Sequence, residues 1–297
     1  MDFREYLDKS AKEIEGEVEK ILSQWLKEVE KTDKKLTPLA KAFIKACKGG
    51  KRIRGTLVKL GYELATAHLR EVTSSHLGGV THLGGVTHLG DGILQIAAAY
   101  EIIHAAILAH DDIIDQSPIR RNHPSLYQAL GGNHYGISQT ISLGDLGFFL
   151  SINIISESKF PEKVKSRALN YFSKVMMETA LGEMLELEDG DVLTTAKLKT
   201  ARYTISGPLI MGIILGGGNG KIIRQLEEFG ENLGIAYQIK DDILDKDGYY
   251  KAGLVGAKKE AEKYKNKAMK ILPSITKGKK MSKLLQQMAQ YLVERSR

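Results

Sequence analysis

The sequence has almost no cysteine and little proline. Cys47 stands alone among 297 residues, which excludes a disulfide framework and a thiolate metal site and favours a reducing, cytoplasmic location. Only six prolines interrupt the chain, and the alternation of apolar and polar residues that marks strands is scarce. The sequence therefore predicts an all-α fold.

A basic stripe with interleaved aromatic residues is also lacking. The formal net charge is +7, but lysines and arginines are spread along the whole chain, so no nucleic-acid partner is expected. A modest basic excess also suits an enzyme whose substrates are polyanions.

No segment has the composition of a signal peptide or of a clear membrane span. Residues 1–22 are charged throughout, unlike a secretory leader. Residues 93–110 are apolar but contain Glu101 and two histidines, and residues 136–155 are broken by Asp145 and several hydroxyls. Helices that are apolar on nearly all sides also occur at the centre of large helical proteins. Both stretches are therefore predicted to be buried core helices, and no transmembrane segment is expected.

Prolines and glycines predict where helices begin and end. Thr37 followed by Pro38 is typical of an N-cap and a first-turn proline, and Gly49-Gly50 ends that helix. Pro118 ends the helix that starts near residue 93. No composition shift or linker divides the chain, so we expect about a dozen helices in a single domain, residues 1–297.

Residues 76–90 form a tandem six-residue repeat, HLGGVTHLGGVTHLG. Its histidines, His76, His82 and His88, are six residues apart and do not share a helical face, and the run is rich in glycine. A loop is therefore expected here rather than a metal site.

Two Asp-rich motifs carry the first chemical signal. In HDDIIDQSPIRR, Asp111 and Asp115 are four residues apart and share a helical face, beside Asp112. Carboxylates at a helix C-terminus oppose the helix dipole and repel one another, so a cation is implied. Oxygen ligands without cysteine or paired histidine indicate Mg²⁺. An acidic helix end capped by Arg120 and Arg121 is the alternative interpretation.

The second motif is QIKDDILD, in which Asp241, Asp242 and Asp245 repeat the spacing of the first. It again ends an apolar helix, and two facing carboxylate clusters would hold several Mg²⁺ ions against one diphosphate.

A third element, GGKRIRG at residues 49–55, has two glycines where a helix begins. Helix N-termini attract phosphate, so this element suits an anionic substrate.

Together these pieces resemble the trans-isoprenyl diphosphate synthases, the polyprenyl synthetase family that includes farnesyl and geranylgeranyl diphosphate synthases. The matching segments occur in family order between about residues 40 and 245: GGKRIR, EIIH, DDIIDQSPIRR, LGD, LGE, KTARYT and AYQIKDDILD. The resemblance implies an isoprenoid synthase-type bundle of helices around a central cavity, and a homodimer. It also implies a Mg²⁺-dependent, head-to-tail condensation of isopentenyl diphosphate with an allylic diphosphate.

The resemblance implies a role for each matched residue. Isopentenyl diphosphate would be bound by Lys51, Arg54, His104 and Arg121. Mg²⁺ would be held by Asp111, Asp115 and Asp241, supported by Asp112, Asp242 and Asp245. The allylic diphosphate would contact Arg120, Lys199 and Lys240, while Thr200 and Gln238 would steady the reacting carbons. Standing alone, His104 would instead indicate a core histidine and Lys199 an exposed helix lysine.

Two other classes of protein stay open at this point. A non-catalytic partner subunit of a prenyl diphosphate synthase would be expected to lose one Asp-rich motif, whereas this chain keeps both. A terpene cyclase shares the helices and one Asp-rich motif, but GGKRIR and the second motif argue against it.

The chain departs from the family pattern after Asp245. The family continues with a Gly/Lys/Asp-rich loop that covers the active site, whereas here KDGYYKAGLVG leads directly to the terminal helices. Either the loop is deleted, or it was omitted and the numbering was closed over it. A break in the chain between Asp245 and Tyr249 would indicate an omitted loop. At a second position, Asn122 stands where the family often has glycine.

The helix that ends in Asp111 provides a ruler for product length. At 1.5 Å per residue, Ala106 lies about 7.5 Å from Asp111 along the axis, Ile103 about 12 Å and Tyr100 about 16 Å. Family members that stop at fifteen carbons often have an aromatic residue near the Ala106 position. Ala106 is too small to block there and Ile107 blocks only partly. Tyr100 is the first bulky residue on this helix, although Phe148 and Phe149 of the later LGDLGFFL segment could also close the floor of the pocket. We therefore expect a product of twenty carbons or longer, unless Ala106 serves close helix packing.

Overall fold

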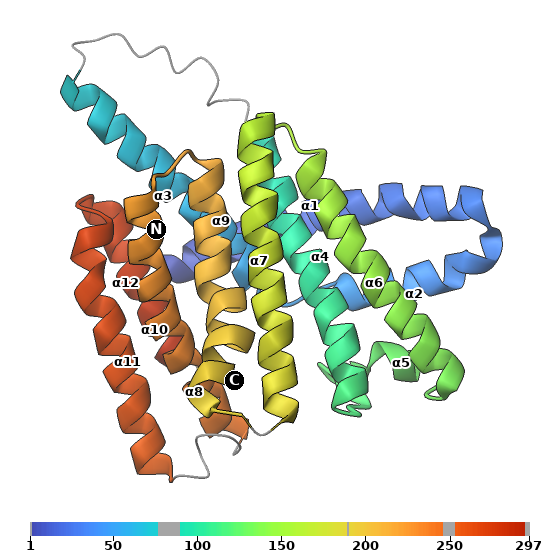
Figure 1. Cartoon of the computed structure of the whole chain (residues 1–297). Coiled ribbons are helices and arrows are strands. Elements are labelled where there is room, and N and C mark those ends of the chain that lie inside the picture. The colour runs from blue at the N-terminus through green and yellow to red at the C-terminus, as the bar shows by residue number, and fades with distance from the viewer. Residues whose placement is uncertain (1, 77–89, 189, 246–252, 295–297) are drawn as a thin grey trace. The chain divides into compact units, whose positions relative to one another are not determined.

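The computed structural model describes residues 2–76, 90–188, 190–245 and 253–294, apart from the side chains of residues 68–76, 90, 91 and 245. Helices dominate it (Figure 1), so the all-α prediction is confirmed. The elements in chain order are α1 (Phe3–Thr32), η1 (Lys34–Leu36), α2 (Thr37–Cys47), α3 (Ile53–His76), α4 (Gly90–Ile114), β1 (Ile119–Arg120), β2 (His123–Pro124), α5 (Leu126–Ala129), α6 (His134–Ser156), α7 (Glu162–Leu187), α8 (Val192–Thr195), η2 (Ala196–Ser206), α9 (Gly207–Leu215), α10 (Gly220–Asp245), α11 (Leu254–Ile275) and α12 (Lys279–Glu294).

Two predictions fall outside the described residues. The loop expected over residues 76–90 lies outside the described residues except at its two ends, where His76 is the last residue of α3 and Gly90 the first of α4, so these two end residues were assigned wrongly. The break expected between Asp245 and Tyr249 falls in residues 246–252. Both stay predictions.

Helix boundaries follow the proline and glycine signals closely. α2 begins at Thr37 with Pro38 in its first turn, but the N-cap is Leu36, without a side-chain cap bond. The prediction that Thr37 is the N-cap was therefore wrong by one residue, because the preceding 3-10 turn runs directly into the helix. Gly49 and Gly50 follow α2 with φ angles of 73° and 96°, a left-handed conformation that glycine adopts without strain.

The chain divides into two compact units, each described here by itself. Unit 1 comprises Met1–Asp8, Leu57–Thr87 and Phe160–Arg297, and unit 2 comprises Lys9–Thr56 and His88–Lys159. The expectation of one domain over residues 1–297 stays a prediction.

In unit 2, α4 and α6 lie side by side (Figure 1). Glycine makes their approach possible: a Cβ atom at Gly147 of α6 would lie 2.8 Å from the Cβ of Ala106 on α4 and 2.7 Å from the ring of Phe43 on α2. A side chain cannot be accommodated at such distances, so α2, α4 and α6 pack closely at this point.

In unit 1, α10 lies beside α11, and α3 packs on α9 (Figure 1). A Cβ atom at Gly61 of α3 would lie 2.0 Å from the carbonyl oxygen of Leu209, and one at Gly212 would lie 2.1 Å from that of Val58. Two glycines thus bring the backbones of α3 and α9 into contact. Every residue of α9 is buried, which makes this helix a core element of the unit.

The apolar helix α4 is buried as expected. Ile96, Ala97 and Ile102 have no exposed surface. Among the described residues, one helix, Gly92–Ile114, is long and apolar enough to cross a membrane by length and composition, and 72% of its most apolar window is buried. Such burial is typical of a core helix.

The expectation for residues 136–155 was only partly right. One face of α6 is buried through small residues, including Gly144, Gly147 and Ser151. The other face is exposed: Phe149 is 70% exposed, and Ile141 and Ile152 are also exposed. One face of α6 is therefore apolar and exposed. Composition alone could not predict this exposure, since buried and exposed faces can be equally hydrophobic.

Candidate active site

The residues predicted from the sequence fall into two groups, one in each unit. Unit 2 holds the basic segment and the first Asp-rich motif with its arginines, and unit 1 holds the second motif and the KTARYT segment. The expectation that the two motifs face one cavity concerns both units together and stays a prediction.

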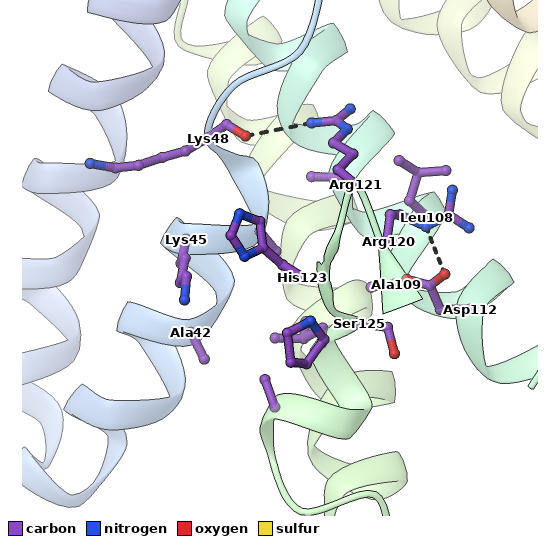
Figure 2. Close-up of a pocket in the computed structure, with 15 residues that line it drawn as sticks. Ala42, Lys45, Lys48, Leu108, Ala109, Asp112, Arg120, Arg121, His123 and Ser125 are labelled. Carbon is purple, nitrogen blue, oxygen red and sulfur yellow. Dashed lines mark hydrogen bonds and ion pairs between the residues drawn. The ribbon is translucent and has the colours of Figure 1, made fainter. Parts of the chain in front are cut away.

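In the first motif, Arg120 joins two of the carboxylates. Its Nη2 lies 2.9 Å from Oδ2 of Asp111 and its Nε lies 2.6 Å from Oδ1 of Asp112 (Figure 2 shows the second pair). The β1–β2 hairpin places Arg120 there, since it folds the chain back after Pro118. Arg120 thus supplies part of the positive charge that the clustered carboxylates require, as the arginine-capped interpretation anticipated.

Asp112 is the most enclosed carboxylate of this motif. Burial raises the pKa of its carboxyl group, the pair with Arg120 lowers it, and the charges of Asp111 and Asp115 raise it further, with a net upward shift. Asp115 follows the last turn of α4, where its backbone N–H donates to the Asp111 carbonyl at 2.9 Å. The motif therefore ends the helix as predicted, and Asp111 and Asp115 are the more open of its side chains.

The turn between β1 and β2 has an unusual backbone. Arg121 has a φ of 52° and Asn122 a φ of 63°, both in the left-handed region. Asparagine is one of the few residues other than glycine that visit this region readily. Asn122, which stands where the family often has glycine, can therefore adopt the left-handed conformation that this turn requires. For Arg121 the conformation is strained, and such strain is often found at functional positions.

Arg121 reaches back to the glycine turn before α3. Its Nη1 donates to the carbonyl oxygens of Gly49 at 3.3 Å and Lys48 at 3.5 Å (Figure 2 shows the second bond). A Cβ atom at Gly50 would lie 3.0 Å from Nη2 of Arg121. Gly50 therefore makes room for the guanidinium, and Arg121 contacts the glycines that open the basic segment. The predicted isopentenyl site stays a prediction.

His104 lies among arginines. Burial lowers the pKa of its imidazole well below the usual range, and the charges of Arg54, Arg121, Arg120 and Arg52 lower it further. The ring is therefore neutral near pH 7, which leaves one nitrogen to donate and one to accept. A neutral donor within a positive field is suited to a phosphate group. His104 is thus a buried histidine in a positive environment, and its binding role stays a prediction.

Sequence reasoning missed the support for this basic segment. Arg52, with 4% of its side chain exposed, pairs with Glu15 of α1 and lies 3.6 Å from Glu101 of α4. Its Nη2 also donates to the carbonyl oxygen of Cys47 at 2.7 Å, and Glu101 accepts from the backbone N–H of Gly55 at 2.8 Å. Glu101 in an otherwise apolar helix was the available signal, since a buried charge requires a partner.

In unit 1, Lys199 lies in the π-helical segment η2 between two carboxylates. Its Nζ is 2.8 Å from Glu183 and also pairs with Glu186, both on α7. Burial alone would lower the pKa of Lys199, but these hydrogen bonds and charges outweigh it and raise the pKa. A Cβ atom at Gly182 would lie 2.4 Å from the backbone nitrogen of Lys199, so the LGE motif is explained by close packing and an ion pair.

Thr200, Gln238 and Asp242 form a hydrogen-bonded chain. The Thr200 hydroxyl donates to Oε1 of Gln238 at 2.5 Å, and Nε2 of Gln238 donates to Oδ1 of Asp242 at 2.7 Å. The KTARYT segment is thereby linked to the second Asp-rich motif. π-helical turns are rare and often occur at functional sites.

The other predicted residues of this group lie on α10. Lys240 and Asp241 are partly buried near its C-terminus, and the side chain of Asp245 lies outside the described part of the chain. Arg202 of η2 pairs with Glu178 of α7 at 3.4 Å and with Glu231 of α10 at 2.7 Å. This network was not predicted from the sequence. It fixes η2 between α7 and α10.

The carboxylates of both motifs have the donor chemistry of a divalent-cation site. Among the described side chains, no three from His, Cys, Asp and Glu gather closely enough to hold one metal ion. Asp111 and Asp112 nevertheless already bind a cationic group of the protein itself, Arg120. Hard oxygen donors without thiolates fit Mg²⁺.

The predicted product-length residues lie along α4. Tyr100 and Ile103 are buried and Ile107 is partly buried, and all three share a stripe with Asp111 at helical spacing. Ala106 lies instead against Gly147 of α6, as described above. The structure thus gives Ala106 a packing contact, and its role in product length stays a prediction.

Comparison with known proteins places the chain in a family. The sequence profile described as polyprenyl synthetase matches residues 36–256. Geranylgeranyl diphosphate synthase from Sulfolobus acidocaldarius is 31% identical over 157 residues, 50% of this chain and 46% of that protein. Farnesyl diphosphate synthase from Geobacillus stearothermophilus is 30% identical over 168 residues, 52% of this chain and 55% of that protein. This chain thus spans about half the length of the curated relatives it matches.

A solved structure shares the fold over nearly the whole chain. Geranylgeranyl pyrophosphate synthase from Corynebacterium glutamicum, complexed with isoprenyl diphosphate and magnesium, superimposes with a TM-score of 0.82 and 20% identity over 98% of this chain and 99% of that chain. The fold expected from the sequence is therefore confirmed. Since the family profile covers well over half of the residues, this chain belongs to the polyprenyl synthetase family.

Proposed function

We propose that this protein is a Mg²⁺-dependent prenyltransferase that joins isopentenyl diphosphate head to tail to an allylic diphosphate. The observation that carries the proposal is the arrangement in unit 2, where a neutral His104 lies among arginines and one of these, Arg120, joins the carboxylates of Asp111 and Asp112. A positive field of this kind suits a diphosphate, and the neighbouring carboxylates suit the cation that accompanies it.

The residues of unit 2 would bind isopentenyl diphosphate. Lys51, Arg54 and Arg121 supply charge, and the neutral His104 donates a hydrogen bond without adding a further cation. The backbone bonds from Arg121 to the glycine turn hold its guanidinium in one orientation. An arginine held in this way would orient the substrate on binding, which would lower the entropic cost of the reaction.

The carboxylates of the two motifs would hold Mg²⁺ ions, with Asp111, Asp115 and Asp241 as principal ligands and Asp112, Asp242 and Asp245 in support. When bound, Mg²⁺ supplies positive charge that stabilises a leaving diphosphate. Arg120, Lys199 and Lys240 would contact the allylic diphosphate as its C–O bond ionises.

Carbon–carbon bond formation needs no nucleophilic side chain. The isopentenyl double bond attacks the allylic cation, and the proton then lost passes to the released diphosphate. Thr200 and Gln238, which are hydrogen-bonded to each other, would steady the reacting carbons. Apolar walls exclude the water that would otherwise quench the cation.

Incubation of the purified protein with Mg²⁺, isopentenyl diphosphate and an allylic diphosphate tests the proposal. The expected result is an allylic diphosphate lengthened by units of five carbons, with no product when a chelator removes the metal. No product under any condition would indicate a non-catalytic subunit, and a cyclic hydrocarbon would indicate a terpene cyclase. Either outcome would contradict the proposal.

We further propose a main product of twenty carbons or longer. Ile107, Ile103 and Tyr100 lie progressively farther from Asp111 on one stripe of α4, and the first bulky aromatic residue among them is Tyr100, about 16 Å away. An extended isoprene unit spans roughly 4–5 Å, so this depth suits about four units.

The Ala106→Phe variant is expected to give a shorter main product, measured by chromatography of the dephosphorylated alcohols. Because Ala106 contacts Gly147, this variant also disturbs the packing of α4 on α6. Ile107→Phe is the cleaner companion, since Ile107 is partly buried on the stripe of Asp111. A wild-type product of fifteen carbons, or an unchanged distribution in both variants, would show that the pocket is elsewhere.

We also propose that the protein is a homodimer, on the basis of an apolar stripe on α7. Met177, Leu181, Met184 and Leu187 recur at helical spacing and are each more than half exposed. The exposed apolar face of α6 is a second candidate surface.

The Leu181→Glu variant is expected to shift a wild-type dimer to monomer in sedimentation velocity, because a charge would be buried in the interface. Glu188→Gln, next to the stripe and exposed, is the matched control and should leave the dimer intact. A wild-type monomer, or a dimer that tolerates Leu181→Glu, would exclude α7 as the interface.

The proposal includes a cytoplasmic location. Cys47 is a free thiol, and burial raises its pKa to about 12, so it stays protonated and unreactive. No disulfide is needed to hold the described fold, which is compatible with a reducing compartment.

A further inference from the structure

The net positive charge of the chain is concentrated in α11 and α12. Residues 253–294, which contain both helices, have ten lysines and three glutamates, a net charge of +7 (10 − 3). Outside this segment, 33 basic residues are balanced by 33 acidic ones (43 − 10 and 36 − 3). Basic residues thus occur along the whole chain, but their excess is a local feature of unit 1.

The lysines of α11 lie mainly on its exposed face. Ala261, Ala268 and Leu272 are buried and mark the side of α11 that packs in unit 1, chiefly on α10 (Figure 1). The opposite side has four exposed lysines, called here the lysine row: Lys259, Lys263, Lys267 and Lys270. They fall within an arc of about 80°, because each residue advances a helix by about 100°, and they extend over about 17 Å.

The same face begins with an apolar side chain. Val255 is 82% exposed and stands four residues before Lys259, so it continues the lysine row toward the start of α11. Leu254 beside it is 39% exposed. Exposed apolar side chains next to a row of lysines are typical of helices that lie on the surface of a bilayer.

Few carboxylates neutralise this segment. Its three glutamates pair with Lys263 and Lys265 alone, at distances of 2.8–3.4 Å. In the described part of the chain, the other eight lysines of residues 253–294 have no carboxylate within ion-pairing distance. The positive charge is therefore available to an external partner.

Lysines continue around the turn between the two helices. Lys277, Lys279 and Lys280 are exposed and follow the C-terminal end of α11, where the lysine row ends at Lys270. Successive lysines of the row are about 4–6 Å apart along the helix axis, less than the Debye length of about 10 Å at 0.1 M salt. Their charges therefore act together on an anionic surface.

The chemistry of this surface favours a bilayer over a nucleic acid. All ten basic residues of the segment are lysines, whereas discrete phosphate groups are preferentially bound by the bidentate fork of arginine. Surfaces that bind single strands also present aromatic residues for base stacking. Both tyrosines of the segment are only partly exposed, and Tyr291 packs on Phe3 with ring centroids 5.5 Å apart. A straight row of mobile cations instead matches the diffuse charge of a flat anionic surface.

We propose that the outer face of α11 and the turn into α12 bind the surface of an anionic phospholipid bilayer. The lysines attract the headgroups, and Val255 enters the boundary between headgroups and acyl chains. The helix lies along the surface in this arrangement, and no segment needs to cross the bilayer. The proposal does not depend on the proposed reaction, because no lysine of the row belongs to the candidate active site.

The test is cosedimentation of the full chain with lipid vesicles in about 0.1 M salt. Vesicles with about one third phosphatidylserine should bind at least about a hundredfold more tightly than vesicles of phosphatidylcholine alone, since each lysine near an anionic surface strengthens binding about fivefold. Raising the salt to about 1 M should abolish the difference, because the Debye length falls to about 3 Å. Equal partitioning onto the two kinds of vesicle would overturn the proposal.

Two variants of equal net charge locate the surface. The first replaces the four lysines of the row by glutamine and should bind anionic vesicles at least about twentyfold more weakly. The second replaces four exposed lysines of unit 2 that stand among three carboxylates: Lys27, Lys31, Lys34 and Lys35. It should stay within about threefold of the wild type, since it changes the net charge but not the row. Equal losses in the two variants would mean that only net charge matters, and would overturn the proposal.

A competing polyanion tests the choice of partner. Duplex DNA, added at the same concentration of phosphate groups as the anionic lipid, should leave most of the protein on the vesicles, because DNA offers no apolar boundary for Val255. Transfer of the protein to the DNA would show that the lysine row serves a nucleic acid and would overturn the proposal. None of these measurements needs turnover, so the result stands whether or not the prenyltransferase reaction is found.

Discussion

The Asp111→Ala variant, and separately the Asp241→Ala variant, should lose turnover by at least about a thousandfold while keeping the fold. A carboxylate that holds the cation opposite the leaving diphosphate contributes charge stabilisation that no neighbour replaces. Folding should survive the first change because Arg120 retains its pair with Asp112 at 2.6 Å. Initial rates at saturating Mg²⁺ and far-ultraviolet circular dichroism would measure the two effects.

A matched control removes a carboxylate from a comparable position. Glu157 is exposed at the C-terminal end of α6, as Asp111 lies at the C-terminal end of α4, but it belongs to no motif. Glu157→Ala should therefore leave the rate within about twofold, as is usual for exposed sites away from special features. Near-normal turnover in either aspartate variant would refute the proposed metal-ligand role of that residue.

The Arg52→Ala variant should lose about 3–5 kcal/mol of the free energy of unfolding, because it leaves two carboxylates without their buried partner. Arg52 pairs with Glu15 and lies 3.6 Å from Glu101, which is itself 4% exposed. The substitution also removes the bond to the carbonyl of Cys47 at the end of α2. Urea unfolding followed by circular dichroism would give the difference.

Lys48→Ala provides the comparison for Arg52→Ala. Lys48 pairs with Glu19 at 3.5 Å, and both side chains are more than half exposed, so the loss should stay within about 1 kcal/mol. Equal losses of unfolding free energy in the two variants would show that the buried pairs of Arg52 stabilise the fold no more than an exposed pair does. A loss in Arg52→Ala below about 1 kcal/mol would contradict the structural role assigned to it.

Local signals in the sequence were sufficient for the helices and for most of their ends. Proline lacks the N–H that a helix interior needs, and glycine favours helix ends. Accordingly, α2 begins near Pro38, α4 ends before Pro118 and α7 begins after Pro161. The Asp-rich motifs were readable for the same reason: residues four apart share a face of any helix, whatever that helix packs against. The ordered set of motifs then sufficed for the family.

Contacts between distant residues were decided only by the tertiary structure. The partners of Arg52 lie 37 and 49 positions away in the sequence (52 − 15 and 101 − 52), and no local pattern specifies them. The same holds for Arg202 with Glu178 and Glu231. Charge alone did not distinguish these arginines from those of the proposed substrate site, because the difference lies in burial and pairing.

Composition also did not determine which way an apolar face points. Phe149 and Ile152 were expected inside and lie exposed, whereas Ala106 contacts Gly147 between α4 and α6. The sequence by itself determined the helices, the family and the place of the Asp-rich motifs at helix ends, because these depend on spacing along one helix. The packing of Ala106 and the buried pairs of Arg52 depend on how helices meet, and close packing is set by side chains far apart in the chain.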